Sequence, residues 1–417
     1  MTESLGRPKR KNPILRTRVP LLPPSGRSRI ALSLTAAAAL GRFELQVCRD
    51  CGAVQYPPRE ACHRCLSLRL DWKPQSGDGE LISETTLFHS HDVFFRERLP
   101  WRLGMIRLDC GPSIVAHLHG DVLPAPCRVR VGARLDKAGQ AALIAFPVEG
   151  TVNMADDKQL REMTCDPKFR KVLVTDGKTP VGQALVRALV GAGADIVWVG
   201  HAEPWKKTAG FAELTRLAPV TPVPLDVTSS DSVREIGAEI GVKVDILINN
   251  AEVHRTYGIS TRYGVDAAKA EMDVNYFGLL RLAQEFGPVM RSRGADGQSS
   301  ATAWVNLLSV YALANFPVHG TFSASKAAAW SLAQCLRAEM QPAGLRVVNV
   351  FPGPIDDEWN QELPPPKITP DALAKAVVKA LQDGVEDVYP GDVAQEWLAR
   401  WRDNPKVLER ELAAIRS

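Results

Sequence analysis

The sequence contains no apolar run of about 18 or more residues, the minimum that a membrane-spanning helix needs. Its first residues also lack the apolar segment and small-residue cleavage site that together mark a secretory signal. We therefore expect no membrane span and a cytoplasmic protein. The composition, 45% hydrophobic and 24% charged, is typical of soluble proteins, and 417 residues are enough for two or three domains.

Excess positive charge is confined to the start of the chain. Residues 1–30 hold eight Lys or Arg and one acidic residue, a net charge of +7 within a total of +4, so the remainder carries −3. Five prolines divide this segment. We expect a basic, disordered and solvated tail over residues 1–30, and binding of this tail to an acidic partner surface is the alternative.

Four of the eight cysteines form two closely spaced pairs, Cys48/Cys51 and Cys62/Cys65, with ten residues between the pairs. Each Cys-x-x-Cys turn presents two thiolates, and two such turns complete a tetrahedron around zinc. Disulfides are not expected in a chain without a secretory signal. Because sulfur fills all four positions, no site remains for water, so the predicted zinc is structural. A helix and this zinc ribbon are expected over residues 31–72.

Short alternating segments follow the cysteine pairs. Over residues 73–148 they are separated by glycine-containing turns, a pattern typical of a small β-barrel. Residues 149–170 are mostly polar and are predicted to be a linker.

The first part of the chain, from about residue 30 to residue 148, resembles a zinc-ribbon plus OB-fold family associated with acyl-CoA metabolism. Residues 43–52, residues 55–58 and the second cysteine pair carry the resemblance. Members of that family are partners of thiolases and thiolase-like aldolases, so the resemblance implies that this part docks on such an enzyme. An OB-fold can instead bind nucleic acid, but nine Lys or Arg against eight Asp or Glu in residues 73–148 make this the weaker interpretation.

Residues 171–417 alternate between strand and helix signals. Residues 171–175 are a short apolar run followed by a turn and an amphipathic segment, and Asn249-Asn250-Ala251 ends another apolar run. The order and spacing of these motifs resemble the short-chain dehydrogenase/reductase family. The resemblance implies an α/β doubly wound parallel sheet of Rossmann type, so the whole chain is expected to be multidomain.

The resemblance implies four catalytic positions, at Asn275, Ser309, Phe322 and Lys326. In the family the serine holds the substrate carbonyl, the lysine binds the ribose and acidifies a tyrosine, and the asparagine supports a proton relay. Here Phe322 replaces the tyrosine. A phenyl ring cannot transfer a proton, and losing a positioned general acid costs about 10²- to 10⁴-fold in rate. The nearest phenols, Tyr311 and Tyr276, are predicted to be packing residues. The three retained polar residues are interpreted as a buried polar cluster, with residual catalysis as the alternative.

The expected cofactor loop, residues 175–182, also departs from the family pattern TGxxxGxG. Asp176 and Pro180 replace two of its three glycines and Gly182 remains. A carboxylate at this place repels a pyrophosphate, and proline removes an N–H donor. Binding of NADP or NAD is therefore predicted to be weakened, with the acidic residue that selects NAD absent at Gly200-His201. The cofactor-binding positions that the resemblance implies are Gly177, Gly182, Asp226, Val227, Asn250, Ala251, Pro352 and Gly353.

Besides nucleic-acid binding through the basic tail and the barrel, two functions remain open from the sequence. The first is an accessory subunit of an acyl-CoA-processing complex, in which the zinc-ribbon and OB part docks a thiolase and the impaired dehydrogenase-like part pairs with itself or with an active relative. Such pairing is implied for helices over residues 267–290 and 323–340. The second is a working NADP-dependent hydroxyacyl-CoA dehydrogenase or ketoreductase with an atypical site.

Overall fold

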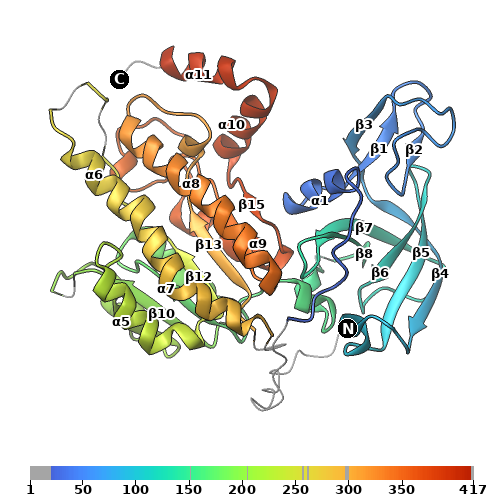
Figure 1. The fold of residues 1–417 in the computed structure, drawn as a ribbon, viewed down its shortest axis with the longest axis horizontal. Helices are drawn as coiled ribbons and strands as arrows, with labels where there is room; N and C mark the ends of the chain where they lie inside the picture. The colour runs from blue at the N-terminus through green and yellow to red at the C-terminus, as the bar shows by residue number, and fades with distance from the viewer. Residues whose placement is uncertain are drawn as a thin grey trace. The chain divides into compact units, whose positions relative to one another are not determined.

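The computed structural model describes residues 20–414, apart from residues 151, 204, 256–257, 261–262 and 296–299. The predicted tail therefore lies mostly outside the described residues. The chain divides into two compact units, which are described separately (Figure 1). The first contains Pro20–Asp166 and Leu381–Glu386, and the second contains Pro167–Ala380 and the chain from Asp387 onward.

The first unit begins with α1 (Leu32–Ala39) and a small antiparallel sheet. Its strands are β1 (Glu44–Cys48), β2 (Val54–Gln55) and β3 (Leu70–Pro74), in the order β2-β1-β3. One cysteine pair lies in the turn from β1 to β2 and the other in the loop from β2 to β3, so the sheet brings both pairs to one end. The predicted zinc ribbon is confirmed.

A closed barrel with the strand order β4-β5-β6-β8-β7 follows. Its elements are β4 (Asp78–Leu87), α2 (Val93–Arg96), β5 (Trp101–Leu108), β6 (Ser113–Leu118), β7 (Cys127–Leu135) and β8 (Ala141–Pro147). Ile114, Ala116 and Leu118 alternate inward along β6 and are buried. This period of two fills the barrel with side chains, and it confirms the predicted OB-type barrel.

The structure departs from the linker predicted over residues 149–170. This stretch forms the short 3₁₀ helices η2 (Met154–Asp156) and η3 (Leu160–Met163). Met154, Leu160 and Met163 are each at most 2% exposed and belong to one apolar cluster with Phe94 and Trp101. These few apolar residues therefore determine where the mostly polar segment lies, because they cover aromatic side chains of the barrel.

The second unit contains a parallel sheet in the order β11-β10-β9-β12-β13-β14-β15. The strands are β9 (Lys171–Val174), β10 (Ile196–His201), β11 (Val220–Pro224), β12 (Ile246–Asn249), β13 (Ala303–Leu307), β14 (Arg346–Val350) and β15 (Asp387–Val388). The direction of the strand order reverses between β9 and β12. In doubly wound sheets the ligand cleft opens at this point, beyond the carboxyl ends of the strands.

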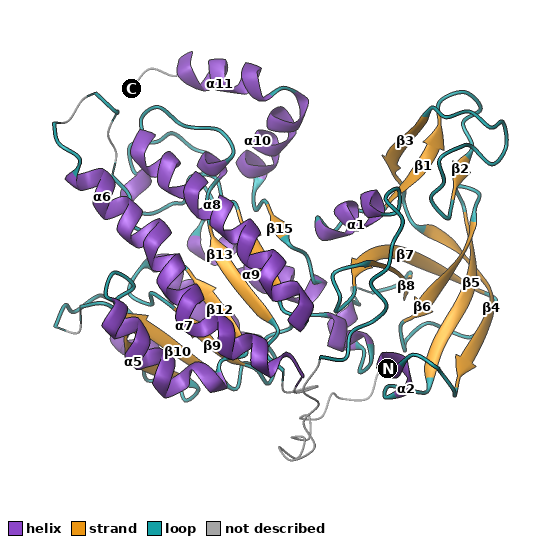
Figure 2. Ribbon diagram, in the orientation of Figure 1, coloured by secondary structure: helices purple, strands orange, loops and turns teal. Residues whose placement is uncertain are grey.

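Helices cover the sheet, and α5, α7 and α8 lie side by side across one of its faces (Figure 2). The α-helices are α3 (Pro180–Gly191), α4 (Phe211–Leu214), α5 (Ser230–Ile240), α6 (Asp266–Met272), α7 (Leu279–Ser292), α8 (Gly320–Met340), α9 (Pro370–Asp383), α10 (Asp392–Asp403) and α11 (Pro405–Ala414). A π-helix, η5 (Asp273–Gly278), joins α6 to α7, and short 3₁₀ helices include η8 (Val310–Ala312) and η10 (Glu358–Asn360). Among the helices of the described part of the chain, none has the length and hydropathy that a membrane passage requires.

Candidate active site and zinc site

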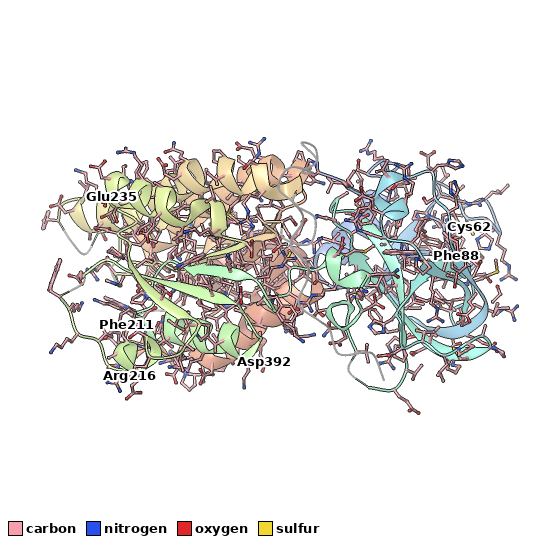
Figure 3. All side chains as sticks on the ribbon, turned by 90° about the horizontal axis from the view of Figure 1, so that it is seen from below. Cys62, Phe88, Phe211, Arg216, Glu235 and Asp392 are labelled. Atoms are coloured by element: carbon pink, nitrogen blue, oxygen red, sulfur yellow. The ribbon has the colours of Figure 1, made fainter. Side chains whose placement is uncertain are left out.

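The four cysteine thiols of the ribbon converge on one point. All four Sγ atoms lie within 4.8 Å of one another, and the pairs Cys48/Cys65 and Cys51/Cys62 are each 3.6 Å apart. Zn–S bonds of about 2.3 Å place the sulfurs of a tetrahedral site about 3.8 Å apart. The donor set fits zinc, and because all four donors are thiolates the site is structural; Figure 3 labels Cys62 within it.

Backbone and amide contacts hold the second cysteine turn in place. Gln46 Oε1 accepts hydrogen bonds from Gln55 Nε2 and Arg59 N, both at 2.9 Å. Gln55 Oε1 in turn accepts from the backbone N–H of His63 at 3.0 Å. Backbone N–H groups, first that of Cys51, lower the pKa of the Cys48 thiol to about 6. Backbone N–H groups, first that of Cys65, lower the pKa of Cys62, whereas the neighbouring thiols raise the pKa of Cys65.

In the second unit, the retained family residues join the ends of neighbouring strands. Thr175 Oγ1 accepts hydrogen bonds from the N–H groups of Asn250 and Ala251 at 3.0 and 3.1 Å. The Asn250 side chain accepts from Asp176 N at 3.0 Å and donates to Asp176 O at 2.6 Å. These bonds fasten β9 to β12 at the switch point. Asn250 and Ala251 therefore have a structural role whether or not a nucleotide binds.

Asn275 and Ser309 are also buried, and both make local hydrogen bonds. The Asn275 amide lies in the π-helix, exchanges two bonds with the backbone of Val253 at 2.9 and 3.0 Å, and donates to Ser325 Oγ at 2.9 Å. Ser309 Oγ accepts from Tyr311 N at 3.2 Å and so begins the short helix η8. Both side chains are at most 6% exposed.

Lys326 is the most deeply buried cation of this cluster, at 2% exposure. Its Nζ lies 2.6 Å from Glu252 Oε2, donates to the carbonyl of Leu307 at 3.0 Å, and lies 5.4 Å from the centre of the Phe322 ring. A buried ammonium requires a partner, and here the partner is a carboxylate of the same chain. The positive charge of the lysine is therefore balanced by a carboxylate of the chain itself.

An aromatic stack lies beside this ion pair. The His254 ring stacks on Phe322, with centroids 4.1 Å apart and planes 19° apart, and Trp359 lies 6.5 Å from His254. His254 Nε2 lies 3.1 Å from His319 Nδ1, so one of the two imidazoles donates to the other. Both residues are at most 2% exposed, and burial lowers the pKa of His319 to about 4 and lowers that of His254 as well. At neutral pH both imidazoles are uncharged.

Tyr311 does not replace the missing phenol. It is 3% exposed and stacks on Phe316, with ring centroids 5.3 Å apart. Burial raises its pKa, and the nearby carboxylate of Glu252 raises it further. A phenol that transfers a proton near neutral pH needs the opposite shift.

The polar groups of the predicted cofactor turn, residues 175–182, hydrogen-bond to one another. Asp176 Oδ1 accepts from Lys178 N at 2.9 Å, and burial raises the pKa of this carboxyl group. Thr179 Oγ1 caps α3 by accepting from Gly182 N at 3.1 Å, and Pro180, in the first turn of the helix, has no N–H. Few N–H groups remain free to bind a pyrophosphate at this helix terminus.

The segment after β10 folds over the same turn. Lys178 Nζ donates to the carbonyls of Glu203 and, at 2.8 Å, Lys206. A Cβ atom added to Gly177 would lie 1.9 Å from Val199 Cγ1 and 3.2 Å from Phe211 Cε2, so this face of the turn is filled by side chains. Figure 3 labels Phe211. The ammonium nearest the turn therefore binds carbonyl groups of the chain itself.

The remaining cofactor-binding positions that the resemblance implied contact other residues of the chain. Asp226 Oδ1 accepts from the N–H and hydroxyl of Thr228 at 2.9 and 2.7 Å. Val227 packs against Gly278, the carbonyl of Pro352 accepts from Val310 N at 3.0 Å, and Gly353 lies against Val393. All four lie near carboxyl ends of strands, as the resemblance implied.

Three residues of the cleft were not anticipated from the sequence: Glu252, His254 and His319. Glu252 had a signal, because it is a charged residue directly after Asn249-Asn250-Ala251, where a strand ends at the switch point. The two histidines are 65 residues apart, and no spacing motif connects them.

Three protein-family models match successive parts of the chain. Residues 35–71 match the rubredoxin-like zinc ribbon domain of ChsH2, residues 72–140 match its C-terminal OB-fold domain, and residues 170–367 match short chain dehydrogenases. An uncharacterized oxidoreductase of Staphylococcus aureus (strain USA300) is 30% identical over 218 residues, which are 50% of this chain and 89% of that protein. The chain belongs to the short-chain dehydrogenase family. A zinc ribbon and an OB-fold domain like those of ChsH2 precede its dehydrogenase part. Both predicted resemblances are confirmed.

Two further relatives extend the comparison. A dehydrogenase/reductase SDR family protein 7-like of Drosophila melanogaster is 27% identical over 276 residues, covering 60% of this chain and 81% of that protein. Among solved structures, a short chain dehydrogenase of Burkholderia cenocepacia J2315, in complex with NADP, is 33% identical with a TM-score of 0.53. That match covers 59% of this chain and 98% of the Burkholderia chain.

Proposed function

We propose that the chain is an accessory subunit of an acyl-CoA-processing complex. Its zinc-ribbon and OB part docks a thiolase or thiolase-like aldolase, and its dehydrogenase-like part is impaired in hydride transfer and pairs with itself or with an active relative. The observation that carries the proposal is the Glu252–Lys326 ion pair beside Phe322. Two requirements of the family's chemistry, an ionisable phenol and an available lysine, are missing at once.

The contacts of the cofactor cleft support this proposal at three places. Glu252 neutralises the lysine that the resemblance assigned to the ribose. Asp176 brings a carboxyl group to the turn where a pyrophosphate would lie, and Lys178 is bound to two carbonyl groups. A dinucleotide would have to replace all of these internal contacts, so its net binding energy is reduced by each of them.

The zinc-ribbon and OB part supports the docking role. Its two family matches are contiguous over residues 35–140, and the four zinc ligands are in position. Members of the family that the sequence resembles are partners of thiolases, so the same role is assigned to this part by analogy.

Nucleic-acid binding by the barrel is not supported. Of the four phenylalanines in residues 73–148, Phe94 and Phe146 are 1% and 8% exposed. Phe95 packs against Trp101 with ring centroids 5.3 Å apart, which leaves Phe88 at 77% exposure (Figure 3). A stacking platform needs several exposed rings in a basic groove.

A second candidate function is an NADP-dependent reductase with an atypical acid. One observation favours it: the imidazole of His254 lies on the face of Phe322 and is hydrogen-bonded to a second imidazole. The NADP complex of the Burkholderia relative makes NADP the cofactor to test.

The rate of NAD(P)H formation from hydroxyacyl-CoA substrates distinguishes the two functions. We expect the wild-type chain and the Phe322→Tyr variant to remain at the background rate, because a restored phenol still faces a lysine paired with Glu252. The matched control is Lys326→Met in the wild-type chain, which should leave the rate unchanged. Wild-type turnover that falls at least tenfold in Lys326→Met would establish the reductase instead.

A further inference from the structure

The two cysteine turns of the ribbon share a left-handed position and one backbone hydrogen bond, but they have different residues after the second cysteine. In the first turn this residue is Gly52, with φ +70°, and in the second it is Leu66, with φ +62°. The N–H of Gly52 donates to Cys48 O and that of Leu66 donates to Cys62 O, each at 3.0 Å. Glycine adopts this left-handed conformation without steric cost, whereas a branched side chain does not.

Among the residues that the structure describes, little packing compensates for the leucine. The Leu66 side chain is 78% exposed, and Leu68, two residues further, is 76% exposed. At Gly52 an added Cβ would meet no atom within 4 Å, so space is not what distinguishes the two turns. A strained backbone that presents an apolar side chain to solvent lowers the stability of the isolated chain, and such positions occur at binding sites.

The loop that carries the two leucines is held rigidly. Cys62 N donates to Ser67 O at 2.8 Å, and Ser67 Oγ lies 2.5 Å from Asp50 Oδ2. Arg69 binds the same carboxylate. Because the loop is ordered before any partner arrives, little conformational entropy remains to be lost on binding.

We propose that Leu66 and Leu68 form an apolar anchor through which the zinc ribbon docks on its partner. The inference rests on the proposed function and names the surface: the partner is the thiolase-type enzyme, and it presents an apolar pocket with a carboxylate at its rim. The carboxylate is expected because Arg64 is exposed beside Leu66 and has no ion-pair partner among the described residues, whereas Arg49 and Arg69 are paired with Asp71 and Asp50.

The decisive variant is Leu66→Gly, because it removes the anchor and gives the backbone the residue that it favours. The full chain keeps one zinc ion and unfolds at the same or a higher temperature, whereas its affinity for the thiolase-type enzyme falls by roughly tenfold to a hundredfold, as expected for a buried leucine. A leucine that only shielded the zinc would instead give faster release of zinc to a chelator and unaltered affinity. The matched control is Gly52→Ala, which strains the first turn, lowers the unfolding temperature and leaves the affinity of the folded protein unchanged.

The measurement is a calorimetric titration of the full chain with each purified thiolase-type enzyme of the organism that encodes it. Tight binding by the wild type and weak binding by Leu66→Gly support the anchor. Equal binding by both overturns the anchor and leaves the proposed function standing. Absence of binding by the wild type to any of these enzymes overturns the docking role, and the anchor with it.

Discussion

Glu252 Oε2 lies 2.6 Å from Lys326 Nζ, so the cleft lysine of this dehydrogenase-like domain is paired with a carboxylate from the loop that follows β12. The lysine is 2% exposed and the glutamate 26%. The pair couples two segments of the fold, the switch-point loop and α8. The charge of the lysine is therefore balanced by the chain itself and not by a bound cofactor.

Replacing Glu252 with Gln should destabilise the second unit by about 3 kcal/mol, because it leaves a buried ammonium without a counter-charge. The double variant Glu252→Gln/Lys326→Met should recover most of this loss, since an apolar side chain then replaces the buried charge. Denaturant unfolding of the two variants and the wild type measures both differences. Equal stability of the single variant and the wild type would show that the ion pair contributes nothing.

The His254–His319 pair predicts a dependence of stability on pH. Burial lowers both folded-state pKa values below that of an unfolded histidine, to about 4 for His319. The unfolded chain therefore binds more protons at acidic pH, so this stability is fully present above about pH 6.5 and is lost as pH falls toward 4. For His319 alone, whose pKa is lowered to about 4, the loss is on the order of 3 kcal/mol.

The variant His319→Phe should lose less stability than the wild type between pH 6.5 and pH 4.5, because the group whose protonation opposes folding is gone. His89→Asn, which removes an exposed histidine, serves as the matched control and should follow the wild type. Denaturant unfolding at a series of pH values measures the slopes. Identical slopes for His319→Phe and the wild type would contradict the buried neutral pair.

Zinc should be present at one ion per chain and should stabilise the first unit only. The variant Cys51→Ser removes one of four thiolate ligands and should lose the metal and the ribbon structure, whereas Cys127→Ser, at a cysteine outside the cluster, should retain both. Metal analysis and chelator release measure the difference. Retention of zinc by Cys51→Ser would show that the four thiolates are not the ligand set.

Two glycines of α3 should respond in opposite ways to alanine. A Cβ at Gly182 would lie 1.9 Å from Asp176 O, whereas a Cβ at Gly191 meets no atom within 4 Å. Gly182→Ala should therefore cost more than about 2 kcal/mol, and Gly191→Ala should be neutral or stabilise by up to about 1 kcal/mol. Thermal unfolding without any cofactor measures both. If Gly182→Ala left the free energy of unfolding unchanged, packing would not explain the glycine, and nucleotide binding would.

Periodicity and short motifs in the sequence predicted the fold, but they did not predict which side chains pair in the dehydrogenase-like site. The spacing of Cys48, Cys51, Cys62 and Cys65 predicted the zinc site because metal geometry is local to two turns. The pairing of Glu252 with Lys326 and of His254 with His319 was not predictable, because each joins segments more than 60 residues apart and depends on side-chain placement. The short helices within residues 149–170 were not predicted, because three buried apolar side chains outweigh a mostly polar composition.

The most direct test of the central claim is a calorimetric titration of the purified full chain with NADPH and with NADH. If the Glu252–Lys326 pair and the self-bonded turn at Asp176 close the cleft, neither dinucleotide produces binding heat at millimolar concentration. A micromolar dissociation constant for either one would contradict the account, because the cleft would then exchange its internal contacts for a cofactor and the chain would be a dehydrogenase with an unusual acid.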